Sequence, residues 1–295
     1  MQLIPQLEHY QSPRQVELWN RVHNCYVPMG PAESEVFYRN SFSSGIKFIH
    51  DTSLDYLTLG AGSGWKEAIL GETLGWEKLN RVISIDAAEE FVHQTREVFI
   101  QKGYGGSYEV EVGNLNQPLN LVGGQSGTIK MVTAFGLIPN MEPEQFFTVT
   151  NRFTEDGDYL WLSANLMDRG QEAVLAQYAN KETEDWLSQW FRERQLSGED
   201  YEFSWSVENQ PFGYQIQLAA RFLKDVEIGA STYSKGESIL VFFTNRMRSD
   251  LFAEKLRQGS YAILFQEKNK DDGVWLCKKK SSCGDIGRFP RPAVF

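Results

Sequence analysis

Hydrophobic residues in the central part of the chain fall into short apolar runs that alternate with amphipathic stretches. The runs have the length of strands, and the stretches between them repeat apolar positions with a helical period. This alternation predicts βαβ units, in which helices join parallel strands. The predicted strands span residues 54–59, 81–86, 108–112, 129–135 and 159–164, and the predicted helices span 65–74, 89–101 and 143–153.

Beyond Asp168 the alternation stops, and we expect an insertion in this part of the chain. Residues 172–195 are predicted to be helical. Strands at 201–207 and 214–222 pair across a turn, which gives the insertion an antiparallel character. In the first fifty residues we expect a helix at 13–24 and a helical or irregular stretch at 33–49.

The last part of the chain adds one more strand, a helix and a hairpin. The strand spans 239–243, and the helix spans 249–258, with Ser249 as its cap and Gly259 at its end. Strands at 261–266 and 274–278 then form a hairpin through a turn at 271–273. An antiparallel strand pair therefore follows the parallel units.

Composition and charge narrow the class of protein. With 41% hydrophobic residues the chain can bury a core. A formal charge of −10 argues against a nucleic-acid partner, because Lys and Arg supply most phosphate contacts. The basic cluster at 278–280 is interpreted as a solvated end of a strand. No signal peptide pattern opens the chain, and no apolar run approaches the ~20 residues that cross a bilayer. We expect a soluble, cytoplasmic monomer.

Cysteine and histidine spacing indicates neither a disulfide framework nor a metal site. The cysteines, Cys25, Cys277 and Cys283, are odd in number and far apart, as is usual in a reducing compartment. The 4 histidines are scattered and lack the spacing of metal ligands. We therefore expect no bound metal.

The sharpest local signal follows the strand at 54–59. The segment Gly60-Ala61-Gly62-Ser63-Gly64 leads directly into a helix, whose first N–H groups and dipole favour an anionic ligand group. In a dinucleotide fingerprint the third glycine comes three residues after the second, but here it comes two after. The tighter turn suits S-adenosylmethionine, which has a carboxylate and a sulfonium but no pyrophosphate. The alternative is a purely structural turn.

Further candidates end the next strands at the same edge of the sheet. Asp86 would accept hydrogen bonds from both ribose hydroxyls of a nucleoside, or would cap the following helix. Asn114, with Leu115 beside it, would accept from an adenine amino group or would be a plain turn residue, and the residues favour neither. Phe135-Gly136 ends the fourth strand at the crevice where open sheets bind ligands. Gly136 there would let a methyl acceptor approach the sulfonium.

The order and spacing of these motifs resemble the histidine-specific methyltransferase family. Its best-known member trimethylates the α-amine of histidine on the way to ergothioneine. The likeness rests on colinear matches over about residues 54–278, while the first fifty residues match poorly. The matching segments are 59–64 with Lys66, then Asp86, 113–114, 135–143, 157–162, 165–168, Tyr178 and 235–238.

The resemblance implies S-adenosylmethionine as cofactor, with Lys66 among its ligands, and it assigns an acceptor site. Asn140 matches the asparagine that holds the acceptor's amine and carboxylate, and Tyr178 matches the tyrosine that reaches the carboxylate. Phe242 and Thr244 fall where the family has a glutamate and a serine that grip imidazole. Because phenylalanine removes the partner that a buried imidazole needs, we do not expect histidine as the acceptor.

Catalysis by such a site would depend mainly on orientation and exclusion of water. An amine must lose its proton before it attacks, and Tyr178, Asn140 or water would take that proton or align the lone pair. Trp205, Tyr214 and Phe242 are candidates to face a methylated cation. For Trp205 and Tyr214 a place in the core of the hairpin is the better explanation.

Together these features predict an α/β fold with a Rossmann-like seven-stranded methyltransferase sheet, an antiparallel terminal hairpin and a second α+β domain. Residues 51–168 and 246–295 would bind the cofactor, and residues 1–50 and 169–245 would bind the substrate. We expect an N-methyltransferase of a small amine or amino-acid derivative in specialised metabolism. One alternative acceptor is a prenylated tryptophan, which other members of the family methylate. Alternatives of another class are a nicotinamide-dependent oxidoreductase and a non-catalytic cofactor-binding protein.

Overall fold

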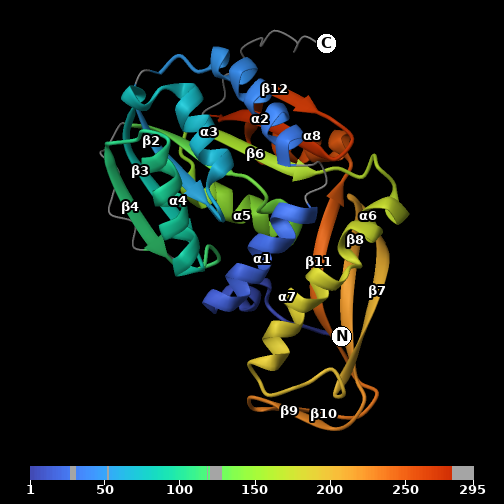
Figure 1. Cartoon of the computed structure of the whole chain (residues 1–295). Coiled ribbons are helices and arrows are strands. Elements are labelled where there is room, and N and C mark those ends of the chain that lie inside the picture. The colour runs from blue at the N-terminus through green and yellow to red at the C-terminus, as the bar shows by residue number, and fades with distance from the viewer. Residues whose placement is uncertain (27–30, 52, 118, 120–127, 281–295) are drawn as a thin grey trace.

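Two β-sheets organise the chain, and helices pack against both (Figure 1). The fold is described from a computed structural model, which places residues 1–26, 31–51, 53–117, 119 and 128–280. The larger sheet contains, in spatial order, β12 (Tyr261–Lys268), β13 (Asp272–Lys279), β6 (Tyr159–Asn165), β5 (Ile129–Ala134), β2 (Leu54–Leu59), β3 (Leu79–Asp86) and β4 (Ser107–Val112). The smaller sheet contains β1 (Gln2–Leu3), β11 (Ser238–Met247), β8 (Gly213–Phe222) and β7 (Tyr201–Gln210), and β9 (Val226–Ile228) pairs with β10 (Ser231–Tyr233) at its tip.

The helices are distributed between the two sheets. Those of the larger sheet are α2 (Pro31–Gly45), α3 (Trp65–Leu74), α4 (Glu89–Gln101), α5 (Pro143–Phe153) and α8 (Ser249–Gln258). Those nearer the smaller sheet are α1 (Pro13–Tyr26), α6 (Gln171–Tyr178) and α7 (Lys181–Arg192). Short 3-10 turns are η1 (Gln6–Tyr10), η2 (Ile46–Phe48), η3 (Trp76–Lys78) and η4 (Ile138–Asn140). No helix of the described residues has the length and hydrophobicity that crossing a membrane requires.

The central strands are largely buried and rich in apolar residues because helices cover both faces of the larger sheet. Along β2 the side chains alternate: Tyr56 packs with α2, α3 and α4, whereas Leu57 packs with α5 and α8. Every residue of β2 is buried. This explains why the sequence shows continuous apolar runs here rather than a polar and apolar alternation.

The strand order reverses direction at one point of the larger sheet. From β2 the chain proceeds outward through β3 to β4, then returns to β5 on the other side of β2 and proceeds to β6. These strands are parallel, so their carboxyl ends share one edge. A crevice therefore opens at the carboxyl edge between β2 and β5, where open α/β sheets bind ligands.

The terminal hairpin is confirmed, with changes at its turns. β13 pairs antiparallel with both β12 and β6. Asp272, which we assigned to the turn, is the first residue of β13. Ser249 does not cap α8: the cap position is Arg248, without a side-chain hydrogen bond. The helix ends at Gln258 with Gly259 in the cap position, as predicted, and the left-handed residue is Ser260, with φ 67°.

The helical stretch predicted at 172–195 is two helices, α6 and α7. The break follows Tyr178, and Asn180 caps the second helix by accepting a hydrogen bond at Oδ1 from the Thr183 amide at 2.9 Å. An asparagine side chain that satisfies a free amide favours a new helix start over continuation.

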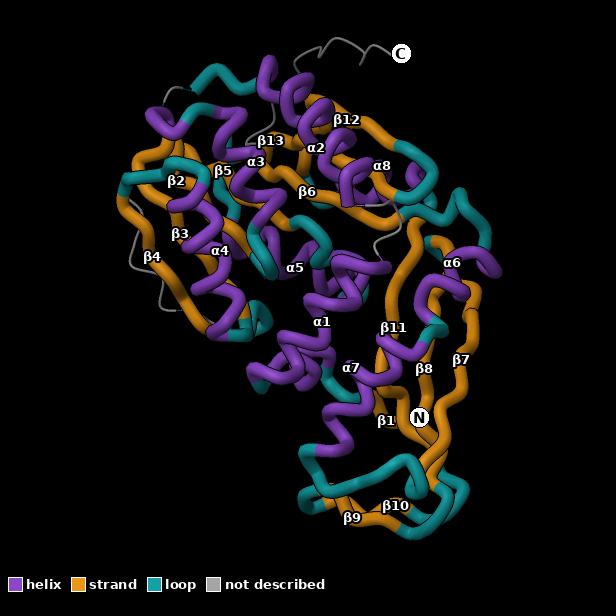
Figure 2. Tube along the Cα trace, viewed as in Figure 1, coloured by secondary structure: helices purple, strands orange, loops and turns teal. Residues whose placement is uncertain are grey.

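The elements that pack around each of the two sheets divide the chain differently from the predicted domains. Helix α2 packs against α3 and β12, and its Tyr38 and Phe42 lie in the core of the larger sheet. Residues 31–45 therefore belong with the larger sheet rather than with a domain formed by 1–50. The predicted boundary at 245/246 falls inside β11, which runs on to Met247. Figure 2 shows α1 and α7 lying together beside the smaller sheet.

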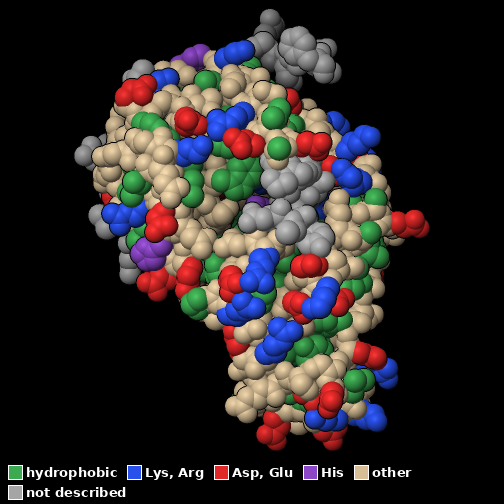
Figure 3. Space-filling view, in the orientation of Figure 1, with side chains coloured by type: hydrophobic (Ala, Val, Ile, Leu, Met, Phe, Trp, Pro, Cys, Tyr) green, Lys and Arg blue, Asp and Glu red, His purple; other side chains and the backbone are tan. Residues whose placement is uncertain are grey.

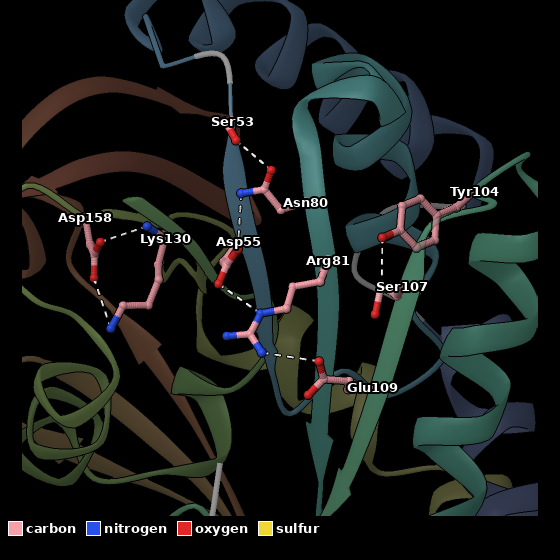
Figure 4. A network of polar contacts seen from close by, with 9 residues as sticks. All are labelled: Ser53, Asp55, Asn80, Arg81, Tyr104, Ser107, Glu109, Lys130 and Asp158. Atoms are coloured by element: carbon pink, nitrogen blue, oxygen red, sulfur yellow. Dashed lines mark hydrogen bonds and ion pairs between the residues drawn. The ribbon is translucent and has the colours of Figure 1, made fainter. Parts of the chain in front are cut away.

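A polar network fixes the amino edge of the larger sheet, opposite the crevice (Figure 4). Arg81 of β3 donates to Asp55 of β2 at 2.9 Å and to Glu109 of β4 at 3.2 Å. Asn80 donates to the second oxygen of Asp55 at 3.3 Å. These side chains pair with each other across three strands, so this edge is held together structurally and leaves the opposite edge for ligands.

Candidate functional site

A cavity of about 560 Å³ lies at the carboxyl edge of the larger sheet and extends to the smaller sheet. One end is formed by the glycine-rich loop and the ends of β3, β4 and β5. The other end is formed by η1, α1, α6, α7 and β11. Most of the residues predicted for the site line it: Gly60, Ala61, Gly62, Ser63, Gly64, Lys66, Asp86, Asn114, Leu115, Phe135, Gly136, Asn140, Tyr178, Phe242 and Thr244.

The glycine-rich loop turns sharply from β2 into α3. The Gly60 amide donates to the Ile85 carbonyl at 2.9 Å, and the Gly64 amide donates to the Ala61 carbonyl at 2.9 Å. Gly64 has φ 71°, and a Cβ there would lie 2.6 Å from Thr95 Cγ2 of α4. A glycine is required at this position for both reasons, and the turn presents the first amides of α3 to the cavity.

Asp86 connects this loop to the end of β3. Its Oδ2 accepts a hydrogen bond from the Gly62 amide at 3.1 Å, and its Oδ1 accepts one from the Ala88 amide at 3.0 Å. The Gly62 amide belongs to the loop, and the Ala88 amide precedes α4. The cap position of α4 is Ala88, without a side-chain hydrogen bond, so the capping interpretation of Asp86 is wrong. Burial raises the pKa of Asp86, and the amide hydrogen bonds oppose that shift. The carboxylate also lines the cavity, where further donors can reach it.

Gly136 leaves open space in the cavity wall after β5. It has φ 78°, and a Cβ added to it would meet no protein atom within 4 Å. Its amide donates to Ser163 Oγ at 3.2 Å, which holds the turn in place. Phe135 beside it is buried against Phe42, with 5.3 Å between the ring centroids. The site thus contains a gap next to backbone, of the kind that a closely approaching ligand would occupy.

Asn114 has a local partner. Its Oδ1 accepts a hydrogen bond from the Asn116 amide at 2.9 Å, which is the arrangement of an Asn turn. Leu115 is buried in the core of the larger sheet, and its carbonyl accepts from Arg152 Nη1 at 2.9 Å. Both residues line the cavity as expected, while the turn interpretation of Asn114 has a hydrogen bond to support it.

Lys66 and its neighbours give this end of the cavity its charge. The Lys66 ammonium lies 4.4 Å from the centre of the Tyr38 ring, and burial lowers its pKa while Asp272 and Glu67 oppose that change. Burial raises the pKa of Glu67 to about 8, so this carboxyl is largely protonated at neutral pH. Asp272 was not among the predicted residues. Burial raises its pKa, which Lys66 and Arg246 oppose.

The other end of the cavity is aromatic. Phe242 lies between Tyr178 and Trp186, with ring centroids 6.0 Å and 5.7 Å away. Tyr10 and Trp19 extend this wall, with centroids 6.1 Å apart. Sequence reasoning missed Tyr10, Trp19 and Trp186 as cavity residues. Aromatic side chains on an amphipathic helix were the available signal, and such residues more often face a core.

Two predicted residues do not line the cavity. Trp205 donates from Nε1 to Glu184 at 3.0 Å and packs between the hairpin and α7. Tyr214 is fully buried with Val174 and Ile216 beneath α6. Both belong to the packing of the smaller sheet. Trp205 pairs with Leu218 and Tyr214 pairs with Arg246, so they lie on the sheet face that carries Phe242, where α6 and α7 cover them.

Arg246 is a further residue that the sequence did not indicate. It is 1% exposed and donates from Nη2 to the Tyr178 hydroxyl at 2.7 Å. It also donates from Nη1 to Thr244 Oγ1 at 3.2 Å. A buried arginine therefore stands directly behind two residues of the cavity wall.

On the face seen in Figure 3, acidic and basic side chains are interspersed, and neither kind gathers into a broad patch. Among the described residues, no three His, Cys, Asp or Glu side chains gather in a way that could hold a metal ion.

Comparison with solved structures identifies the fold. The CurJ carbon methyltransferase aligns over 90% of this chain and 59% of its own, with a TM-score of 0.52 and 11% identity. The PH0226 protein from Pyrococcus horikoshii OT3 aligns over 89% and 98%, with a TM-score of 0.50 and 11% identity. An S-adenosylmethionine-dependent methyltransferase from Clostridium acetobutylicum ATCC 824 aligns over 90% and 99%, with a TM-score of 0.49 and 13% identity. No family model matches the chain, and no curated protein matches it in sequence.

The chain therefore has the Rossmann-like α/β fold of class I methyltransferases, with a mostly parallel seven-stranded sheet. This confirms the predicted fold class. At such low identity the likeness concerns the fold. The resemblance to the histidine-specific family stays a prediction.

Proposed function

We propose that this protein is an S-adenosylmethionine-dependent N-methyltransferase that acts on a small amine or amino-acid derivative. The observation that carries the proposal is the single cavity that joins two unlike ends. One end has the glycine-rich loop and Asp86, and the other has an aromatic wall with Tyr178 and Asn140. A donor and an acceptor bound at these ends would meet beside Gly136, where the wall leaves space.

The cofactor end fits the groups that S-adenosylmethionine presents. Asp86 would accept from the ribose hydroxyls, Lys66 would hold the carboxylate, and Asn114 with Leu115 would border the adenine. The cofactor, when bound, supplies a methyl group on a sulfonium, which is a good leaving group. What remains for the protein is to hold both molecules in line and exclude water.

The acceptor end favours an amine with an apolar or aromatic part. Tyr10, Trp19, Trp186 and Phe242 offer ring faces that would stabilise a methylated, cationic nitrogen. Asn140 and Tyr178 are the polar groups available to hold the amine and a carboxylate. Phe242 is 3% exposed and packed between two rings, so imidazole would find no charged partner there. The same apolar wall supports a prenylated-tryptophan-like amine as the second candidate acceptor, in a specialised-metabolite pathway.

Two experiments test the proposal in sequence. Isothermal titration with S-adenosylhomocysteine should show micromolar binding by the native protein, and titration with NAD should show none. Transfer of a labelled methyl group from S-adenosylmethionine would then be screened over amines and amino acids. Histidine is the expected negative, and tryptophan derivatives are the first candidates. Binding of NAD in place of S-adenosylhomocysteine would replace the proposal with an oxidoreductase.

A further inference from the structure

Arg246 is a buried cation that touches the wall of the acceptor end without lining the cavity itself. Its guanidinium contacts four oxygen atoms. Nη2 reaches the Tyr178 hydroxyl at 2.7 Å, and Nη1 reaches Thr244 Oγ1 at 3.2 Å and the Asn245 carbonyl at 3.0 Å. In the orientation that satisfies its neighbours, the Asn165 amide accepts from Nη1 at 2.9 Å. Tyr178, Thr244 and Asn165 all line the cavity.

The direction of each of these hydrogen bonds is fixed by chemistry. Arginine carries only donors, so every partner of Arg246 must accept. A hydroxyl oxygen that accepts from arginine keeps its own hydrogen for another partner. Within the described residues, neither the Tyr178 hydroxyl nor the Thr244 hydroxyl donates to a protein acceptor. Both residues line the cavity, so a ligand bound there could offer each hydroxyl an acceptor.

In the described structure, hydrogen bonds connect the Arg246 guanidinium to a carboxylate through the side chain of Asn165. Among the described residues no carboxylate forms an ion pair with it. Asn165 donates from its amide nitrogen to Asp272 Oδ1 at 3.0 Å, so it links Arg246 to that carboxylate. Tyr38 donates to Asp272 Oδ2 at 3.4 Å and completes the chain toward Lys66. The guanidinium is therefore free to polarise the two hydroxyls rather than being neutralised by direct pairing.

We propose that Arg246 is a positioning residue that orients the Tyr178 and Thr244 hydroxyls as hydrogen-bond donors toward the methyl acceptor. The orientation follows from the geometry of this chain, while its use in recognition rests on the proposed function. It assigns Tyr178 the task of donating to an oxygen or nitrogen lone pair of the acceptor. It removes Tyr178 as the group that takes the amine's proton, and leaves Asn140 to align the amine and water to carry the proton away.

The test is a vibrational measurement on the ligand-free protein, which needs no knowledge of the acceptor. The intensity ratio of the tyrosine Fermi doublet in Raman spectra depends on whether the phenolic oxygen accepts or donates a hydrogen bond. Subtracting the spectrum of Tyr178→Phe from that of the native protein isolates Tyr178 among the 12 tyrosines. Tyr214→Phe supplies a matched reference, because the Tyr214 hydroxyl is buried without a hydrogen-bond partner in the described structure.

The native spectrum should show Tyr178 as both acceptor and donor, with a doublet ratio unlike that of Tyr214. In Arg246→Met the ratio of Tyr178 should fall to that of a hydroxyl that only donates to water. In Arg246→Lys it should lie between the two values, since an ammonium has fewer and less directed donors. A native Tyr178 that shows no acceptor signature, or a ratio unchanged in Arg246→Met, would overturn the inference.

Two controls separate this result from other failures. Thermal unfolding of each variant shows whether the buried substitution is tolerated, and the native difference spectrum remains decisive if Arg246→Met does not fold. Titration of the native protein with S-adenosylhomocysteine tests the proposed function independently. Absence of that binding together with the expected Raman result would retain the hydroxyl orientation and reject the methyltransferase.

Discussion

Replacement of Asp86 should weaken cofactor binding. Its two carboxylate oxygens accept from the loop amide of Gly62 and from the amide of Ala88, which precedes α4, and the carboxylate borders the cavity. In a bound nucleoside the two ribose hydroxyls would donate to it. A hydrogen bond to a charged group contributes ~1.5–3 kcal/mol, so two contribute at least ~3 kcal/mol. Since ~1.4 kcal/mol corresponds to a tenfold change, Asp86→Ala should lower affinity about 100-fold.

The assay is isothermal titration with S-adenosylhomocysteine, with Asp86→Asn as the milder variant. The asparagine keeps one acceptor oxygen but turns an NH₂ toward an amide donor, so its effect should fall between the alanine and native values. The matched control is Asp55→Asn, in the same sheet but at the opposite edge, where Asp55 pairs with Arg81 at 2.9 Å (Figure 4). That variant should lose stability and retain affinity.

Two outcomes would refute this reasoning. If Asp86→Ala binds S-adenosylhomocysteine within threefold of the native protein, Asp86 does not hold the ribose. If Asp55→Asn loses affinity to the same extent, the change reflects a general loss of structure. The pH dependence gives a second check. Because burial raises the pKa of Asp86 and only the carboxylate accepts two hydroxyls, affinity should fall as the pH falls through that pKa, and this fall should vanish in Asp86→Ala.

Three further predictions follow from single residues. Gly136→Ala and Gly229→Ala each place a Cβ in open space, at φ 78° and φ 60°, so each should cost ~1–2 kcal/mol of stability. Only Gly136→Ala should also lower the affinity for S-adenosylhomocysteine in titration, because Gly136 lines the cavity. Phe242→Glu would bury an unpaired carboxylate and should lower the free energy of unfolding by at least ~3 kcal/mol in urea. If that free energy is unchanged, the position accommodates a carboxylate, and the argument that histidine is not the acceptor fails. Burial lowers the pKa of His9 from 6.5 to about 4, so between these pH values the unfolded chain binds more protons than the folded protein. The folded protein should therefore lose up to ~3 kcal/mol of stability as the pH falls from 6.5 to 4. His9→Gln should reduce this pH-dependent loss in urea unfolding, and His93→Gln, at an exposed position, should not.

The parts of the fold that local patterns determine were predictable from the sequence. The strand at 54–59 and the helices at 65–74, 89–101 and 143–153 have the predicted bounds, because apolar runs and helix starts are encoded within a few residues. The glycine-rich loop was predictable for the same reason. The break at Asn180 was not, since a helical period continues across it and only the capping hydrogen bond to Thr183 shows that a new helix begins.

The acceptor end depended on contacts that no local pattern contains. Tyr10 and Trp19 come from the first fifty residues, where the resemblance was poor, and Trp186 comes from the insertion. They meet only because η1, α1 and α7 pack together in the fold. Arg246 is two residues from Thr244 on the same strand, but its partner Tyr178 is 68 residues away in the chain. Residues brought together over such distances are visible only in the structure.

The position of β11 explains how an acceptor could change while the cofactor end remains. This strand belongs to the smaller sheet, yet Met247 at its end forms a bridge with Leu166, which follows the last residue of β6. Phe242, Thr244 and Arg246 alternate along it, so they share one face, and a register shift between Leu240 and Phe242 determines which residues that face contains. Because the cofactor end is built from other strands, a substitution at Phe242 can alter the acceptor without touching the glycine-rich loop or Asp86. Under the proposed function, β11 supplies one wall of the acceptor end, which η1, α1, α6 and α7 complete.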